Sequence, residues 1–268
     1  MVLLGSGESK EGMVVDRFMG KTVVVTGASS GIGVGIARRF SSEGANVVLA
    51  ARRQELLESL AVELGGERTA AVRTDVTDPG QLRALMTAAV DRFGGIDVLV
   101  SNAGTAVLRT VEETSEQDWR MTMRTDVDSC FFGAQAALPH LRKTRGSIVQ
   151  IASASGLGGD RRIAAYNAAK GAVVNLTRGL AFDLGPDGVR VNTIAPSLTI
   201  APEHESLPQL DSMVARFNER RALPGYSTPD DIGAAAAFLA SEDARFITGI
   251  ILPVDGGITA GSGQPDLF

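Results

Sequence analysis

Short apolar runs rich in β-branched residues alternate, from Lys21 onward, with longer segments in which apolar positions recur at the spacing of a helix. Glycine, serine or aspartate separates most of these segments, as expected for turns. Runs such as VVVT and IDVLV carry apolar residues toward both faces, which is typical of strands in a parallel sheet covered by helices. The alternation predicts an α/β fold built from βαβ units. Strands are predicted at Thr22 to Thr26, Asn46 to Ala50, Thr69 to Thr74, Ile96 to Val100, Ser147 to Ile151, Arg190 to Ile194 and Ile250 to Pro253.

Several helix ends can be located from residue type alone. Asp78-Pro79 and Thr228-Pro229 each place a capping residue before a proline at the first helical position. Gly44 and Gly94 follow helical segments, where glycine commonly ends a helix. The chain has no repeat, low-complexity tract or Pro/Gly-rich linker, so we expect residues 21–268 to form one domain, preceded by an extension over residues 1–20.

One segment, residues 197–226, interrupts the alternation of strands and helices. It contains three prolines and a short amphipathic stretch from Met213 to Phe217. Ligands of open parallel sheets bind beyond the carboxyl ends of the strands, and this segment follows such a strand. We therefore predict that residues 197–226 form a substrate lid.

Composition excludes several classes of protein. The 268 residues include 44% hydrophobic residues, enough for a sizeable core. One cysteine and two histidines give no disulfide and no spacing for a metal site, and a reducing, cytoplasmic location fits best. The net charge is −5 and the arginine pairs are dispersed, so nucleic acid is not an expected partner. The first residues lack the apolar core of a signal peptide, and no apolar run has the length of a membrane helix.

A glycine-rich turn lies between the first predicted strand and the first helix, in VVVTGASSGIGVGIARRF. Gly27, Gly31 and Gly33 allow a tight turn and a close approach of a ligand, and the free N–H groups at the helix start attract a pyrophosphate. The spacing differs from the commoner G-x-G-x-x-G, and such a turn alone also occurs for purely structural reasons. The preceding strand and following helix favour a dinucleotide site.

The end of the second predicted strand bears on the choice of dinucleotide. Ala51 stands where an acidic residue would bind the ribose 2′-hydroxyl of NAD. Arg52 follows directly and can pair with a 2′-phosphate, with Ser29 or Ser30 adding a donor. The alternative is that the arginines only begin a solvated helix. We predict NADP(H) rather than NAD(H).

Tyr166 and Lys170 are spaced to share one face of a helix. A free phenol titrates near about pH 10, so a phenol that exchanges protons at neutral pH needs assistance. A cation about 4 Å away at an effective dielectric near 20 supplies about 4 kcal/mol, roughly the amount required. Lys170 can be that cation, although by itself such a pair is more often a surface contact.

Six motifs occur in a fixed order: TGASSGIG from Thr26, DVT from Asp75, SNAG from Ser101, Ser153, Tyr166 with Lys170, and NTIAPS from Asn192. Together they resemble the short-chain dehydrogenase/reductase family over nearly the whole chain from Lys21. The resemblance implies a Rossmann-like, doubly wound, parallel seven-stranded sheet with helices on both faces. It also implies a homotetramer that moves hydride between a nicotinamide and an alcohol or ketone. Within the family, SGLGGD, AAKGAVVNLTR, FNER and a GQP tail are most similar to acetoin reductases and meso-2,3-butanediol dehydrogenases.

The resemblance also assigns site residues. Ser153, Tyr166 and Lys170 are the expected catalytic residues, with Ser155 as the nearest alternative serine. Asp126 stands where the family carries a catalytic asparagine, so the amide donor is lost. Aspartate can substitute if the position works through its backbone carbonyl, and its negative charge can draw Lys170 closer. The expected cofactor-binding residues are Gly27, Ser29, Ser30, Gly31, Ile32, Gly33, Arg52, Asp75, Val76, Asn102, Ala103, Gly104, Tyr166, Lys170, Pro196 and Thr199.

The predicted function is an NADP(H)-dependent oxidoreductase for a small ketone, hydroxyketone or secondary alcohol. One alternative is a biosynthetic ketoreductase for a larger cyclic or polyketide substrate. Another is a dinucleotide-binding regulator without turnover, which Asp126 would favour. Trp119, Met121 and Met123, between the fourth and fifth strands, are expected to pack in the core.

Overall fold

The computed structural model describes residues 16–264. Its seven strands form one parallel sheet in the order β3-β2-β1-β4-β5-β6-β7, so the chain begins in the middle of the sheet and winds outward in both directions. The strands are β1 (Thr22–Thr26), β2 (Asn46–Ala51), β3 (Thr69–Arg73), β4 (Val98–Ser101), β5 (Ser147–Ile151), β6 (Arg190–Pro196) and β7 (Ile251–Val254). The expected fold class is confirmed.

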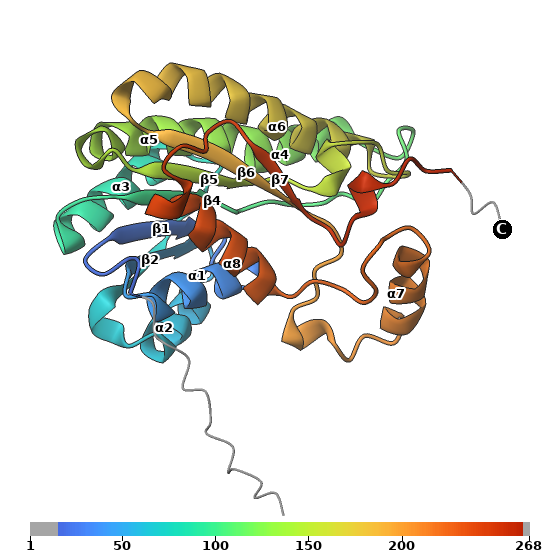
Figure 1. The fold of residues 1–268 in the computed structure, drawn as a ribbon, viewed down its shortest axis with the longest axis horizontal. Coiled ribbons are helices and arrows are strands. Elements are labelled where there is room, and N and C mark those ends of the chain that lie inside the picture. Colours follow the sequence, from blue (N-terminus) through green and yellow to red (C-terminus); the bar gives the residue numbers. More distant parts are fainter. Residues whose placement is uncertain (1–15, 265–268) are drawn as a thin grey trace, which may run out of the picture.

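Helices cover both faces of the sheet (Figure 1). They are α1 (Ile32–Ser42), α2 (Gln54–Glu63), α3 (Pro79–Phe93), α4 (Glu116–Met123), α5 (Ser129–Thr144), α6 (Ala164–Leu184), α7 (Leu210–Asn218) and α8 (Pro229–Ala240). One layer contains α1, α2 and α8, and the other contains α3, α5 and α6.

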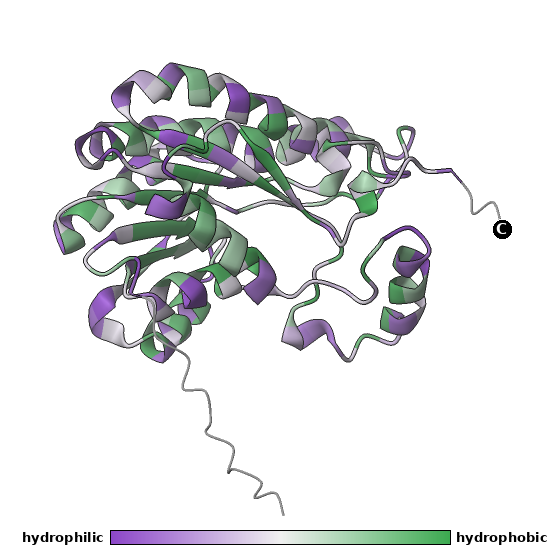
Figure 2. Ribbon diagram, viewed as in Figure 1, coloured by the Kyte–Doolittle hydropathy of each residue, from purple (hydrophilic) through white to green (hydrophobic). Residues whose placement is uncertain are grey.

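Successive strand residues point to opposite layers, which explains why the strands are apolar throughout. Val23 and Val25 of β1 pack with the α1, α2 and α8 layer, whereas Val24 packs with the α3, α5 and α6 layer. Figure 2 shows the same arrangement as hydrophobic strands between helices of mixed character. Because all seven strands are parallel, their carboxyl ends lie at one edge of the sheet, beside the segments that follow them.

The predicted strands and helix ends are confirmed, with small shifts in their bounds. Thr74, Ile96 and Asp97 lie outside the strands, while β6 continues to Pro196. The Asp78 carboxylate accepts hydrogen bonds from the Gly80 and Gln81 amides, and Thr228 forms a capping box with Asp231. Gly44 and Gly94 both have positive φ, of 90° and 84°.

The first and last helices are in close contact. A Cβ atom on Gly35 of α1 would come within 2.5 Å of the Pro229 carbonyl oxygen at the start of α8. Glycine at residue 35 therefore lets the start of α8 approach the α1 backbone.

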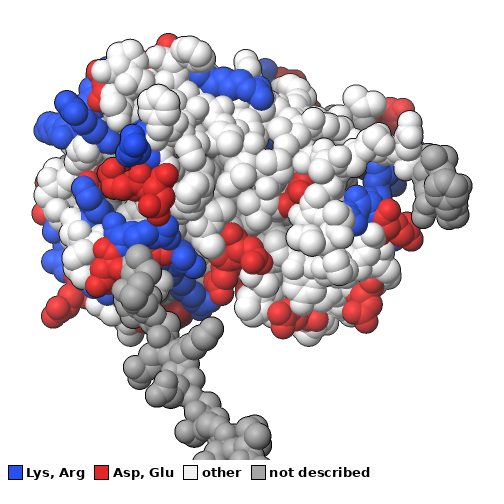
Figure 3. All heavy atoms as spheres, viewed as in Figure 1, with Lys and Arg blue, Asp and Glu red and all other residues white. Residues whose placement is uncertain are grey.

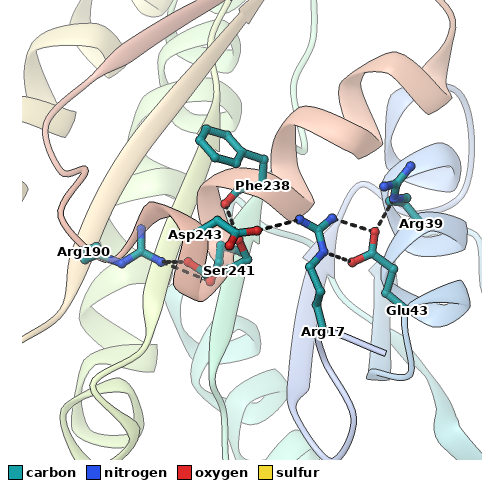
Figure 4. Close-up of polar contacts among 8 residues, drawn as sticks. Arg17, Arg39, Glu43, Arg190, Phe238, Ser241 and Asp243 are labelled. Atoms are coloured by element: carbon teal, nitrogen blue, oxygen red, sulfur yellow. Dashed lines mark hydrogen bonds and ion pairs between the residues drawn. The ribbon is translucent and has the colours of Figure 1, made fainter. Parts of the chain in front are cut away.

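Residues 16–20 lie against the same helical layer. The Phe18 side chain is buried against the Phe40 ring at a centroid distance of 4.8 Å. The Arg17 guanidinium binds both carboxylate oxygens of Glu43, at 2.6 and 2.7 Å, and approaches Asp243 at 3.5 Å (Figure 4). The rest of the predicted extension, residues 1–15, and the last four residues of the tail lie outside the described residues.

The expectation that Trp119 and Met121 pack in the core is wrong. Both side chains are 45% exposed on α4, and Met123 is only partly buried. The buried position of this helix is Thr122, whose hydroxyl donates to the Asp118 carbonyl. A short helix buries only one narrow stripe, so its large apolar residues can face outward.

Residues 197–226 extend away from the sheet and carry α7 (Figure 1). Their ends are fixed by backbone hydrogen bonds, from the Ile200 amide to Ser227 and from the Ala222 amide to Gly256. Charged side chains of both signs lie interspersed on the face seen in Figure 3. Within residues 16–264, no helix combines the length and hydropathy needed to cross a membrane.

Candidate active site

Two adjoining cavities lie at the carboxyl edge of the sheet. The larger, of about 430 Å³, follows the ends of β1, β2, β3 and β4, and the smaller, of about 260 Å³, follows the ends of β4, β5 and β6. They share Ile32, Asn102, Gly104 and Thr105 in their walls. The order of the sheet thus brings segments far apart in sequence to one continuous cleft.

Most of the predicted cofactor residues line the larger cavity. They are Gly27, Ser29, Ser30, Ile32, Gly33, Arg52, Asp75, Val76, Asn102, Ala103 and Gly104. Ala51, Arg53, Thr74, Thr77, Thr105, Met121 and Thr125 complete its lining. The cavity is therefore bordered by the glycine-rich turn on one side and by the ends of β2 and β3 on another.

The glycine-rich turn is packed so closely that larger residues would not fit. A Cβ atom on Gly33 would lie 2.3 Å from the Gly27 carbonyl oxygen, and one on Gly27 would lie 2.8 Å from Ala103 Cα. Gly27 also has a φ of 68°, which favours glycine. The turn is tied to the end of β4 because Asn102 Nδ2 donates to the Thr26 carbonyl at 2.9 Å, and the Asn102 and Ala103 amides donate to Thr26 Oγ1. Two motifs predicted separately therefore form one unit.

A basic group borders the larger cavity beside the two serines of the turn. Arg53 Nη2 donates to Ser30 Oγ at 2.8 Å and to Ser29 Oγ at 3.0 Å. Arg52 lies near Asp75; a hydrogen bond from the Thr77 amide lowers the pKa of that carboxyl, and the Arg52 charge lowers it further. Arg53 was missed in the sequence reasoning, although its place beside Arg52 was the available signal.

The smaller cavity contains the predicted catalytic residues Asp126, Ser153, Tyr166 and Lys170, together with Pro196. Ser153 follows β5, and Tyr166 and Lys170 lie one turn apart in α6. The Lys170 ammonium lies 5.5 Å from the centre of the Tyr166 ring. The helical spacing thus places phenol and ammonium beside the same space, as the sequence predicted.

Lys170 is a buried cation with two oxygen partners. Its Nζ donates to the Ile151 carbonyl at 3.1 Å and lies 2.8 Å from Asp126 Oδ1. Burial favours the neutral amine, but the Asp126 carboxylate and the Tyr166 side chain outweigh it, so the pKa of Lys170 is raised. The lysine therefore remains charged throughout the neutral pH range.

The two serines after β5 have different partners. Ser153 lines the cavity, accepts a hydrogen bond from the Ser155 amide at 3.2 Å and donates a long one to the Pro196 carbonyl at 3.5 Å. The Ser155 hydroxyl instead donates to Asp160 Oδ2 at 2.6 Å and is absent from the cavity lining. This geometry favours Ser153 over Ser155 as the serine that contacts a ligand.

Asp126 lies in a π-helical turn, Arg124–Asp128, between α4 and α5. Its side chain is fully buried, and its Oδ2 accepts a hydrogen bond from the Thr105 amide at 3.0 Å. A π-helical turn is often found at functional sites, where it redirects a side chain. Here it directs the carboxylate toward Lys170.

Two predicted cofactor residues do not line either cavity. Thr199 Oγ1 is paired with the Ser227 hydroxyl at 2.8 Å, within the base of the 197–226 segment. The Gly31 amide donates to Glu203 Oε1 at 3.3 Å. A carboxylate thus already contacts an N–H group at the start of α1, which indicates that this position accepts an anion.

A family model described as enoyl-(acyl carrier protein) reductase matches residues 27–259. The chain is 49% identical to meso-2,3-butanediol dehydrogenase of Serratia marcescens over 94% of this chain and 99% of that protein. It is 41% identical to rabbit (Oryctolagus cuniculus) L-fucose dehydrogenase over 94% of this chain and 89% of that one.

A solved structure from Brucella melitensis, described as the short-chain dehydrogenase/reductase SDR:glucose/ribitol dehydrogenase, superimposes with a TM-score of 0.82 at 35% sequence identity. It covers 90% of this chain and 97% of its own. The likeness therefore extends over most of the chain and not only over the sheet.

Proposed function

Since the chain belongs to the short-chain dehydrogenase/reductase family and is an oxidoreductase acting on alcohols or ketones, we propose that it transfers hydride between NADP(H) and a small ketone, hydroxyketone or secondary alcohol. The observation that carries this proposal is the meeting of Ser153, Tyr166 and Lys170 in the cavity next to the glycine-rich turn. A proton donor, a hydroxyl and a fixed cation are thereby placed beside a site suited to a dinucleotide.

The chain's own residues supply the proton transfer. In reduction, the Tyr166 hydroxyl donates its proton to the substrate oxygen while the carbonyl carbon gains hydride, and the phenolate is later reprotonated from water. The Ser153 hydroxyl donates a hydrogen bond to the same oxygen and so stabilises its developing charge. Lys170 favours the phenolate only as far as the Asp126 carboxylate, 2.8 Å from its ammonium, leaves the positive charge uncompensated. The nicotinamide, when bound, supplies hydride in reduction and accepts it in oxidation.

The residues of the larger cavity fit a dinucleotide. Gly27 and Gly33 hold the turn close to the end of β4, the space around the Gly31 Cα is open, and the Gly31 amide donates to a carboxylate. These features suit a pyrophosphate at the start of α1. Tyr166 and Lys170 from the neighbouring cavity would contact the nicotinamide ribose, as in the family pattern.

The preference for NADP(H) is supported by charge at the end of β2. Arg52 and Arg53 line the cavity with Ser29 and Ser30, and Ala51 provides no carboxylate to repel a 2′-phosphate. Arginine binds phosphate through charge-assisted hydrogen bonds.

The smaller cavity, of about 260 Å³, supports a small substrate. The similarity to a meso-2,3-butanediol dehydrogenase supports the same class, and acetoin and diacetyl are suitable trial substrates. We propose residues 197–226 as the lid, because Ser197 at the start of this segment lines the smaller cavity and Glu203 within it accepts a hydrogen bond from the Gly31 amide of the glycine-rich turn.

We further infer a homotetramer in the cytoplasm. Large exposed side chains occur on α4 and α5 as Trp119 and Phe131, and on α6 and before β7 as Phe182 and Phe246. Two separate apolar surfaces support an assembly larger than a dimer. A chain with a single cysteine suits the reducing cytoplasm.

The experiment follows nicotinamide absorbance with a panel of ketones, acetoin and diacetyl included, using NADPH and NADH in parallel. Tyr166→Phe should abolish turnover while NADPH still binds, because only the proton donor is removed. Tyr226→Phe, at the only other tyrosine, is the matched control, because it removes the same hydroxyl outside the lining of both cavities and should leave the proton transfer intact. Turnover that persists in Tyr166→Phe would refute the assigned proton donor, and faster turnover with NADH would refute the cofactor preference.

A further inference from the structure

We propose that Asp126 is a positioning residue that neutralises Lys170 and thereby sets the pH range in which the Tyr166 hydroxyl works. The inference rests on the proposed function, since it assigns a role within the same site. It departs from the resemblance, which supplies an asparagine at this position and so an uncharged side chain.

The geometry is that of a buried ion pair. Asp126 Oδ1 lies 2.8 Å from Lys170 Nζ, the aspartate is fully buried, and the lysine is 3% exposed. Water does not screen the two charges, so their mutual effect is stronger than at a surface. To the Tyr166 ring, the pair acts as a dipole with no net charge rather than as an isolated cation.

The pair is held in place by groups on other elements. The second carboxylate oxygen accepts the Thr105 amide, and the ammonium also donates to the Ile151 carbonyl. Gly104 leaves room for both, because a Cβ atom there would lie 2.8 Å from Asp126 Oδ1 and 3.2 Å from Lys170 Nζ. The contact is therefore enclosed by the β4 exit, the β5 exit and the π-helical turn.

Few other charges face this pair. The titratable residues of the smaller cavity are Asp126, Tyr166 and Lys170. Cys130 of α5 lies behind them and donates its thiol hydrogen to the Asp126 carbonyl; burial raises the pKa of this thiol to about 11, so it is neutral in the working range. From the loop before α6, Asp160 is engaged by the Ser155 hydroxyl. Asp126 is therefore the negative charge that balances Lys170.

Replacing Asp126 with asparagine keeps the shape and removes one negative charge. The ammonium then acts on the phenol as an uncompensated cation and favours the phenolate. We expect the phenolate to form at a pH lower by at least about one unit than in the parent protein.

The chain has only two tyrosines, so the ionisation can be followed directly. In a Tyr226→Phe background, near-ultraviolet phenolate absorbance reports Tyr166 alone, without substrate or cofactor. Asp126→Asn should shift this titration to lower pH, and the pH profile of alcohol oxidation by the loaded enzyme should move the same way. Asp128→Asn, an exposed aspartate in the same π-helical turn, is the matched control and should shift neither.

A charge-free variant tests the same point if the single variant fails to fold. Asp126→Asn with Lys170→Met removes both charges and leaves no uncompensated ion in the interior. If the native pair is neutral, the parent and this double variant should titrate within about one pH unit of each other.

The proposal would be overturned if the Tyr166 phenol of Asp126→Asn titrates at the same pH as in the parent protein or at a higher one. It would also be overturned if the phenol of the parent titrates more than about one pH unit below that of the double variant. The titration needs no turnover, so its outcome is separate from the proposed function. Absence of turnover with every ketone would refute the proposed function while leaving the titration result intact. Turnover with an unshifted titration would refute only the role of Asp126.

Discussion

Gly104 is the residue on which the two charged groups of the smaller cavity most directly depend. Its missing side chain leaves the space in which Asp126 and Lys170 meet. Gly104→Ala should therefore displace one of them, lower kcat at least about tenfold and cost about 1–3 kcal/mol of stability. Steady-state kinetics and thermal unfolding check this result. Gly95→Ala, where a Cβ atom meets nothing within 4 Å, should change neither, and equal effects in both variants would contradict the explanation.

Arg52 and Arg53 can be separated by the cofactor they affect. Arg53 already binds Ser29 and Ser30 in the larger cavity. A charged hydrogen bond to a 2′-phosphate is worth about 1.5–3 kcal/mol, so Arg53→Ala should raise the Kd for NADPH about tenfold or more and leave that for NADH nearly unchanged. Titration of nicotinamide fluorescence with both cofactors measures the ratio. An equal loss with both would assign Arg53 to holding the turn and not to the phosphate.

At this scale the sequence predicted that Tyr166 and Lys170 meet, and the family resemblance pointed to an attraction between Asp126 and Lys170. Tyr166 and Lys170 follow from helical spacing, which is a local property. The pairing of Lys170 with Asp126 joins residues 44 positions apart in sequence through a π-helical turn, and no local pattern encodes it. Arg53 was missed because the direction of an exposed arginine depends on its neighbours in the fold.

Among the elements, a hydrogen bond joins the proposed lid to the start of α1, from the Gly31 amide to Glu203. The carboxylate lies where an anion is favoured, so it should compete with the pyrophosphate of a dinucleotide. Glu203→Gln should tighten NADPH binding about two- to fivefold, the equivalent of about 0.3–1 kcal/mol. Calorimetric titration tests this prediction, with Glu205→Gln in the same segment as control. Weaker NADPH binding in Glu203→Gln would instead show that the Glu203 carboxylate contributes to cofactor binding.

The stability of the folded protein should depend on pH through the contacts of residues 16–20 with the end of α1 and the segment after α8. Glu43 is 4% exposed; burial raises the pKa of its carboxyl, but the hydrogen bonds from Arg17 and Arg39 outweigh burial and hold the pKa below its ordinary value (Figure 4). A lowered folded-state pKa stabilises the protein above the unfolded value of about 4.3 and loses this contribution as pH falls through the folded value.

Glu43→Gln should therefore cost about 1–3 kcal/mol at neutral pH and show a weaker loss of stability below about pH 4. Urea unfolding across this range measures both effects. Glu63→Gln, which breaks the exposed pair with Arg38, should cost less than about 1 kcal/mol. If Glu63→Gln lost more stability than Glu43→Gln, burial would not explain the contribution of the Glu43 carboxylate.

Strands and helix caps were predictable because their signals are local. Asp78, Thr228 and Gly94 all lie where their residue types predicted. The π-helical turn between α4 and α5 was not predicted, because helical periodicity continues through it and only the hydrogen bonding changes. The exposure of Trp119 and Met121 could not be predicted either. An apolar side chain on a short helix occurs both in cores and on surfaces between copies of a chain, and the sequence does not distinguish the two.

On the scale of the whole molecule, the exposed aromatic residues give a test of assembly. Phe246 is 95% exposed in the segment before β7, and Phe182 is 87% exposed on α6. The two segments touch, since a Cβ atom on Gly249 would lie 3.4 Å from Ala181 Cβ. Phe182→Ser with Phe246→Ser should convert a tetramer into smaller species at unchanged circular dichroism, as measured by sedimentation. Val62→Ser, an exposed apolar residue on α2, is the control, and an unaltered tetramer in the double variant would place the contact elsewhere.

The close contact between Gly35 and Pro229 connects α1 with the start of α8. The segment proposed as the lid returns to the body of the protein at Ser227, two residues before Pro229, and Pro229 rests on the helix that starts at the glycine-rich turn. The proposed hinge of the lid therefore lies against the helix that begins at the proposed dinucleotide turn. Binding of the dinucleotide would then fix the position of the proposed lid. This coupling favours an ordered mechanism in which the nucleotide binds before the substrate.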